Sequence, residues 1–234
     1  MIKVRVIGII SCALAAAGTC SWGQTRNELP GGSYLTLRQQ SAWLLNYPMV
    51  VRTLNLTAAE KAALAKARTA YEQKENRLVS HGAPTDAQVQ ELDRQFAGSA
   101  LAALSSAHQW RLFEALLQVQ GTEALTDKGV AERLGLSPGE RERIHEIFAR
   151  ANLREEDFEA SLAQKLLAVP RAAPASLYAK KRNAVVEAAT PERKKLQALR
   201  KADEDKALAM LTPKQQLAWK DLLGQPFPLT RYRP

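Results

Sequence analysis

Cysteine is almost missing from this chain of 234 residues, and its two copies, Cys12 and Cys20, both lie close to the N-terminus. The rest of the chain therefore has no thiol for a disulfide or a thiolate metal site. Glycine is also scarce, with 12 residues, and no stretch alternates polar and apolar residues for long enough to require a strand. Alanine, leucine and long polar residues dominate instead, which predicts an all-α protein stabilised by packing.

Long apolar runs are missing as well, apart from one at the N-terminus. Lys3 and Arg5 precede the apolar run 6–17, and Ser21 and Gly23 then supply small residues at the −3 and −1 positions of a cleavage site before Gln24. This pattern is typical of a secretory leader, here residues 1–23, and the run is shorter than the roughly 20 residues that a spanning helix needs. We therefore expect an exported protein, periplasmic or extracellular after cleavage near Gly23, with no stable membrane span in its mature chain.

Breaks rich in glycine and proline divide the mature chain into two similar helical units. We expect a flexible lead at 24–35, a first unit at 36–121, a second unit at 122–226 and a loose basic tail at 227–234. Apolar residues recur at helical spacing through both units, and the longest such pattern follows Ser137. Thirty residues of helix there would extend about 45 Å. The sequence predicts long amphipathic helices in an extended hairpin or bundle.

One short pattern recurs along the chain: Leu, then Thr or Ser, then two further residues, then Glu or Gln. Such a box begins a helix, because the hydroxyl accepts the N–H of the third helical residue and the Glu or Gln reaches back to the N–H of the cap. The leucine is placed to pack on the following turn as a hydrophobic staple. The three boxes comprise Leu56, Thr57 and Glu60; Leu136, Ser137 and Glu140; and Leu211, Thr212 and Gln215.

The boxes belong to a longer internal match between the two units. Residues 50–57 align with 130–137, and residues 101–105 align with 208–212, with leucines at the same offsets. We interpret the match as a duplication, although a helical protein rich in Leu-Thr caps could show it by chance. In this alignment His108 replaces the expected Gln, so the cap is either imperfect or displaced to Ser106.

No group of residues has the spacing of a catalytic or metal site. His81, His108 and His145 lie on different elements, without the partners at helical spacing that a zinc site requires. The acidic run 155–157 consists of consecutive residues, which do not share a helix face. A Gly-rich phosphate loop and a nucleophile elbow are also missing from the sequence. The sequence therefore predicts a protein that is not an enzyme and that has no cofactor and no bound metal.

Positive charge is the strongest bias that remains, at +9 for the chain and +7 once Lys3 and Arg5 are removed with the leader. Nucleic acid is not an expected partner outside the cytoplasm, whereas acidic proteins and envelope polyanions are. The basic residues gather in the second long helical region and form a candidate partner surface, although a merely solvated face would look the same. They are Lys180, Lys181, Arg182, Arg193, Lys194, Lys195, Arg200 and Lys201.

The box at 211–215, in a helical and cysteine-poor chain behind a secretory leader, resembles the LTxxQ motif of the Spy/CpxP-like periplasmic proteins. The boxes at 56–60 and 136–140 depart from the motif by carrying Glu for Gln, and the resemblance covers only the boxes and a few flanking positions. It implies an ATP-independent chaperone or an envelope-stress protein, often a homodimer with a curved helical surface. The two units of this longer chain could instead pair within one molecule.

These observations together predict an exported, non-enzymatic helical interaction protein. The leading hypothesis is a Spy-like holdase that binds unfolded or acidic client proteins through amphipathic helices and a basic face. The alternative is a structural or scaffold component of the cell envelope that binds one partner or a cell-wall polymer. Of the three tryptophans on short amphipathic helices, Trp43, Trp110 and Trp219, we expect burial in the core rather than a place in a client groove.

Overall fold

The computed structural model describes residues 36–170 and 175–228, which form α-helices and short 3-10 segments and contain no strand. The all-α prediction is confirmed. The predicted leader and lead, and the tail beyond residue 228, lie outside the described residues. Within the described part of the chain, no helix is long and apolar enough to cross a membrane.

The chain packs into two compact units. The described residues of Arg26–Ala124 and of Leu217–Pro234 form one, called here the N-terminal unit, and those of Leu125–Gln216 form the other, called here the hairpin unit. The first division lies close to the predicted boundary at 121/122. The second falls inside a helix after Gln216, so the last part of the predicted unit 122–226 belongs with the N-terminal unit.

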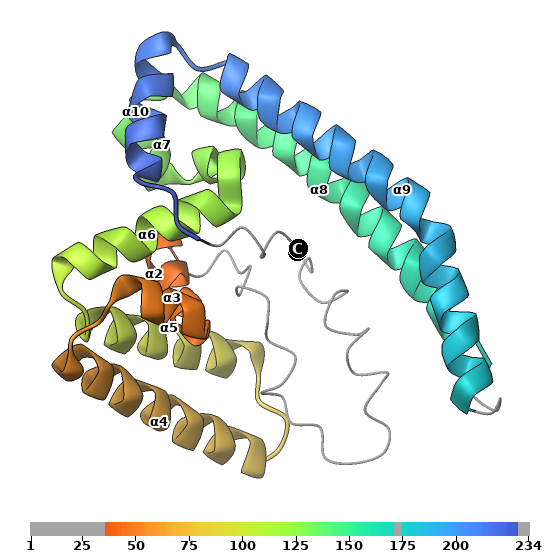
Figure 1. Cartoon of the computed structure of the whole chain (residues 1–234), viewed down its shortest axis with the longest axis horizontal. Coiled ribbons are helices and arrows are strands. Elements are labelled where there is room, and N and C mark those ends of the chain that lie inside the picture. The colour runs from red at the N-terminus through yellow and green to blue at the C-terminus, as the bar shows by residue number, and fades with distance from the viewer. Residues whose placement is uncertain (1–35, 171–174, 229–234) are drawn as a thin grey trace. The chain divides into compact units, whose positions relative to one another are not determined.

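The N-terminal unit is built from five α-helices followed by part of a sixth. These are α2 (Leu37–Ser41), α3 (Pro48–Leu54), α4 (Ala58–Ser80), α5 (Asp86–Ala102), α6 (Ser106–Gln120) and the end of α10 (Pro213–Leu223). A 3-10 segment, η1 (Ala42–Asn46), continues α2, and another, η2 (Gly121–Thr126), follows α6. Figure 1 shows α4 and α5 side by side, joined at one end by their turn.

Three aromatic rings lie at the centre of the packing between η1, α4 and α5. The ring of Trp43 lies 5.8 Å from that of Tyr71, in an edge-on arrangement, and 5.0 Å from that of Phe96. Tyr71 and Phe96 are 5.1 Å apart. Such contacts add to the apolar burial of the rings themselves. Trp43 and Trp219 are buried as expected, but Trp110 is 37 % exposed, because it lies on the outer face of α6.

The segment after α10 is held against α6 by a set of side chains. Gln118 Nε2 donates to the carbonyl oxygens of Leu223 and Gln225 at 2.6 and 2.8 Å, and Gln118 Oε1 accepts from the backbone N–H of Phe227 at 2.7 Å. The guanidinium of Arg111 lies 5.1 Å from the centre of the Phe227 ring, which is buried. The prediction of a loose tail is therefore wrong at Phe227, because an apolar ring so close to α6 gains by packing on it.

The hairpin unit consists of α7 (Lys128–Leu134), α8 (Pro138–Leu167), α9 (Ala175–Ala209) and the start of α10. Figure 1 shows α8 and α9 side by side along their length and curving together. Phe158, Leu162 and Ala189 form a buried cluster between them. Pro191 lies inside α9 without ending it.

Candidate functional site

The three boxes all close as helix starts. Thr57 Oγ1 accepts from the backbone N–H of Glu60 at 3.2 Å, and Glu60 Oε2 accepts from that of Thr57 at 2.9 Å. The same reciprocal pairs form at the other two boxes, between Ser137 and Glu140 and between Thr212 and Gln215. The structure therefore begins α4, α8 and α10 at the residues that the sequence indicates.

The residues that would complete a hydrophobic staple are polar in all three boxes. A staple joins the residue before the cap to the fourth helical residue, and that position holds Lys61, Arg141 or Gln216. Leu56 and Leu211 are nevertheless buried, with exposed fractions of 2 % and 4 %. The expected staple is therefore replaced by burial of these leucines in the cores of their units.

Each unit brings two helix starts together, which the sequence did not predict. In the N-terminal unit, Glu60 Oε1 accepts from the backbone N–H of Ser105 at 2.8 Å and from His108 Nδ1 at 2.7 Å. Ser105 is the cap of α6, so the box of α4 is joined to the start of α6. The backbone N–H of Ser105, the His108 ring and the backbone N–H of Thr57 hold the pKa of Glu60 well below its usual range.

The hairpin unit contains the corresponding junction between the starts of α8 and α10. Gln215, aligned with His108, donates to the carbonyl oxygen of Gly135, just before the box of α8, at 3.3 Å. Hydrogen bonds from Ser137, then the charge of Arg143 and the side-chain amide of Gln215, hold the pKa of Glu140 below its ordinary value. In each unit one side chain of a box thus reaches the start of a second helix: Glu60 in the N-terminal unit and Gln215 in the hairpin unit.

Two further details repeat between the units. Gln109 Nε2 donates to the carbonyl oxygens of Leu101 and Leu104, and Gln216 Nε2 donates to those of Leu208 and Leu211. Asn55 and Gly135, each just before a box, both adopt the left-handed conformation, with φ of 50° and 65°. The cap of α6 is not displaced to Ser106: Ser105 caps it, and His108 turns to Glu60. These shared bonds support the inferred duplication.

The eight basic residues singled out from the sequence separate into two groups. The guanidinium of Arg193 lies 5.7 Å from the Phe158 ring and 3.8 Å from Glu159, and that of Arg200 donates to Asn152 at 2.6 Å. Arg182 lies over Tyr178, and Lys201 pairs with Asp205. Two of these arginines therefore hold α8 and α9 together.

The remaining four, Lys180, Lys181, Lys194 and Lys195, are exposed and have no partner among the described residues. They form two lysine pairs separated by 14 residues, or about 21 Å along a helix. Because 14 residues are close to four helical turns, the two pairs lie on nearly the same face. Large apolar residues of α8 and α9 are exposed as well, namely Leu153, Leu167, Leu177, Val186 and Leu199. We call these nine residues the hairpin surface.

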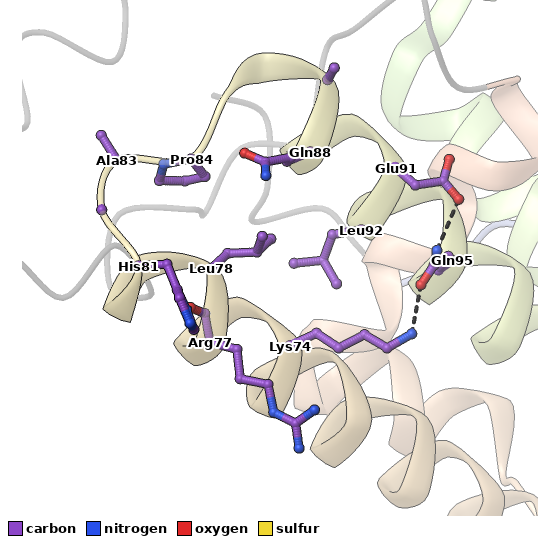
Figure 2. A pocket seen from close by; sticks show the side chains of 12 residues that line it. Lys74, Arg77, Leu78, His81, Ala83, Pro84, Gln88, Glu91, Leu92 and Gln95 are labelled. Atoms are coloured by element: carbon purple, nitrogen blue, oxygen red, sulfur yellow. Dashed lines mark hydrogen bonds between the residues drawn. The ribbon is translucent and has the colours of Figure 1, made fainter.

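A second feature, which the sequence did not reveal, is an open groove of about 720 Å³ between α4 and α5 at their turn. It is called here the α4–α5 groove. Its apolar lining comes from Leu78, Ala83, Pro84, Ala87 and Leu92. Figure 2 shows Leu78 and Leu92 between the two helices. Ser80 to Pro84 indicated only a turn in the sequence, because a groove depends on how two helices pack.

Polar side chains surround this apolar lining. Lys74 Nζ donates to Gln95 Oε1 at 2.7 Å across the groove, and Gln95 Nε2 donates to Glu91 Oε1 at 2.9 Å (Figure 2). Glu91 also pairs with Arg94. The hydrogen bond from Gln95, helped by the charge of Arg94, lowers the pKa of Glu91. Arg77 and His81 lie at the turn end, where His81 Nδ1 donates to the Arg77 carbonyl oxygen at 2.6 Å.

Among the described residues, no three His, Cys, Asp or Glu side chains are grouped as a metal ion would require. Comparisons of the chain with protein-family models, with curated proteins and with solved structures find no match. The geometry of this chain therefore carries the functional argument alone.

Proposed function

We propose that the protein is an exported, non-enzymatic interaction protein that acts as an ATP-independent holdase of the Spy/CpxP-like kind. The hairpin surface is its proposed client-binding region. A holdase must bind many unfolded chains weakly, so it needs apolar and charged contacts without a fixed pattern. Unfolded clients expose both apolar side chains and carboxylates, and such a surface can contact both.

The observation that carries this proposal is the exposure of large apolar side chains on a pair of helices that also present lysines with no partner among the described residues. Leu153 and Leu167 on α8 are 49 % and 58 % exposed. Single exposed apolar residues are common in proteins, but here five accompany four lysines that no described residue pairs with. Lysine stems also cover apolar surface while their amines reach for carboxylates. This combination supports sequence-tolerant binding of acidic, partly unfolded chains.

The alternative proposal is a scaffold component of the cell envelope that binds one partner or a cell-wall polymer. The two lysine pairs, about 21 Å apart along α9, favour it, because a polymer with regularly spaced negative charges could contact both. The two proposals differ in selectivity: a holdase binds many unfolded clients, whereas a scaffold binds one ligand whether or not unfolded protein is present.

Aggregation suppression separates the two proposals. Light scattering would follow three unrelated clients of different net charge as they unfold, without ATP, at increasing molar ratios of the protein. A holdase should delay the aggregation of all three, and that of the acidic client most strongly. A scaffold should leave all three curves unchanged.

A further inference from the structure

The apolar lining of the α4–α5 groove sets the first requirement for anything that binds there. Leucine, alanine and proline side chains line the groove, and its volume of about 720 Å³ lies within the range of about 300–1,000 Å³ typical of small-ligand sites. An occupant must therefore supply apolar side chains to displace water from the lining.

The charges at the edge of the groove set the second requirement. Glu91 is offset by Arg94, its partner on the same helix. Lys74 donates to the neutral amide of Gln95, and its charge also acts on Glu91, so Lys74 and Arg94 share that one carboxylate. The guanidinium of Arg77 is exposed and has no partner among the described residues. The edge therefore carries an excess of positive charge and favours carboxylates beside the apolar part of the occupant.

We propose that the α4–α5 groove binds a short amphipathic helical segment of a partner protein, with large apolar side chains on one face and carboxylates beside them. The apolar side chains contact Leu78 and Leu92, and the carboxylates lie close to Arg77 and Lys74. An amphipathic segment packed against two helices would complete a three-helix arrangement, a common mode of peptide recognition. This site lies in the N-terminal unit and is independent of the hairpin surface, so either proposal can fail alone.

A peptide fits these features better than a fatty acid, which also combines an apolar chain with a carboxylate. A single acyl chain gains most from an enclosed cavity, whereas this groove is open along one side. A peptide covers an open groove with several side chains at once. The two basic residues, separated by nearly one helical turn, also suit two carboxylates rather than one.

Fluorescence anisotropy with a defined probe tests this inference on the whole protein. The probe is a fluorescein-labelled peptide, SDLLEDLFES. One matched peptide carries lysine for each acid, and another carries serine for each apolar residue. Unlabelled decanoate serves as a competitor that represents a fatty acid. The acidic probe should bind saturably and at least about fivefold more tightly than either matched peptide. Each exposed charge pair contributes modestly to binding, but replacing an acid by lysine turns an attraction into a repulsion and so doubles the effect of the pair.

Two variants and one control assign the binding to the groove. Arg77→Glu should lower the affinity for the probe about fivefold, and Ala87→Trp should lower it by filling the groove. Lys66→Glu changes the net charge equally on the same helix, outside the groove, and should have less than about a twofold effect. Circular dichroism shows whether each variant is folded. If Arg77→Glu unfolds, the test depends on Ala87→Trp, whose position is exposed. Equal loss in the control, no loss in Ala87→Trp, or displacement by decanoate at low concentration would each overturn the proposal.

Discussion

Glu60 and His108 lie 48 residues apart in the sequence, yet Glu60 Oε1 and His108 Nδ1 are 2.7 Å apart and join the starts of α4 and α6. The carboxylate can only accept when ionised, so the ring nitrogen donates. The same carboxylate accepts from the backbone N–H of Ser105. Two positive helix ends and one ring thus converge on a single negative charge, an arrangement that favours the ionised carboxylate.

The first prediction concerns acid. The pKa of Glu60 in the folded protein lies well below its ordinary value of 4.5. The ionised carboxylate therefore stabilises the fold fully above pH 4.5, and this contribution is lost as the pH falls from 4.5 toward the folded pKa. Hydrogen exchange of residues 104–109 should therefore accelerate between pH 5 and pH 3, after correction for intrinsic exchange. Glu60→Gln should already exchange faster at pH 7 and show less additional acceleration in acid. Equal pH dependence in both proteins would contradict this role.

The second prediction uses the duplication as its own control. His108→Gln places in the N-terminal unit the residue that the hairpin unit has at the aligned position, Gln215. It should keep a donor for Glu60 and change the thermal midpoint little. His108→Leu should lower the midpoint clearly, because it leaves the carboxylate short of a partner. If both variants melt alike, the hydrogen bond to Glu60 contributes nothing to stability.

The third prediction concerns the box at the start of α10. Thr212→Ala should cost about 1 kcal/mol of unfolding free energy, within a usual range of about 0.5–2, whereas Thr212→Asp should be nearly neutral. Ser137→Ala should cost a similar amount in the hairpin unit. Leu211→Ala should cost more, about 2–5 kcal/mol, because Leu211 is buried. Urea melts of the four variants give these values, and an unmoved midpoint in Thr212→Ala would exclude the capping role.

The fourth prediction compares two glycines. Gly224 has φ of +62°, and a Cβ added there would lie 2.3 Å from the Glu114 carboxyl carbon. Gly224→Ala should therefore destabilise the N-terminal unit by more than about 1 kcal/mol. Gly98, inside α5, has no such obstacle within 4 Å, and Gly98→Ala should be neutral or stabilising by up to about 1 kcal/mol. Thermal melts shifting in the same direction would contradict this difference.

The fifth prediction separates the structural arginines from the available lysines. Arg200 donates to Asn152 and lies 5.2 Å from the centre of the Phe148 ring, so Arg200→Gln should lower stability by about 1 kcal/mol. Lys195→Gln, at an exposed position without a described partner, should change stability by less than about 0.5 kcal/mol. Urea unfolding followed by circular dichroism measures both. Equal losses would mean that the two groups of basic residues are not distinct.

Features of the structure were predictable from the sequence where the interacting residues lie close together in the chain. The helix starts at Thr57, Ser137 and Thr212 were predictable because a cap involves residues only three apart. The pairing of Glu60 with His108 was not, because it depends on how α4 and α6 pack. The only sign of this pairing in the sequence was that His108 stands where the aligned box has Gln. The exposure of Trp110 and the α4–α5 groove likewise depend on packing, which local patterns do not specify.

The most direct test of the proposed function is client protection by a protein whose two lysine pairs are neutralised. The test variant replaces Lys180, Lys181, Lys194 and Lys195 by Gln. The control variant makes the same change of charge at the exposed lysines Lys61, Lys66, Lys128 and Lys214. Light scattering of an acidic client should show that the wild-type protein and the control delay aggregation equally, and that the test variant loses most of this effect at 50 mM salt. No delay by the wild-type protein, or equal delay by all three proteins, would contradict the hairpin surface as a client-binding region.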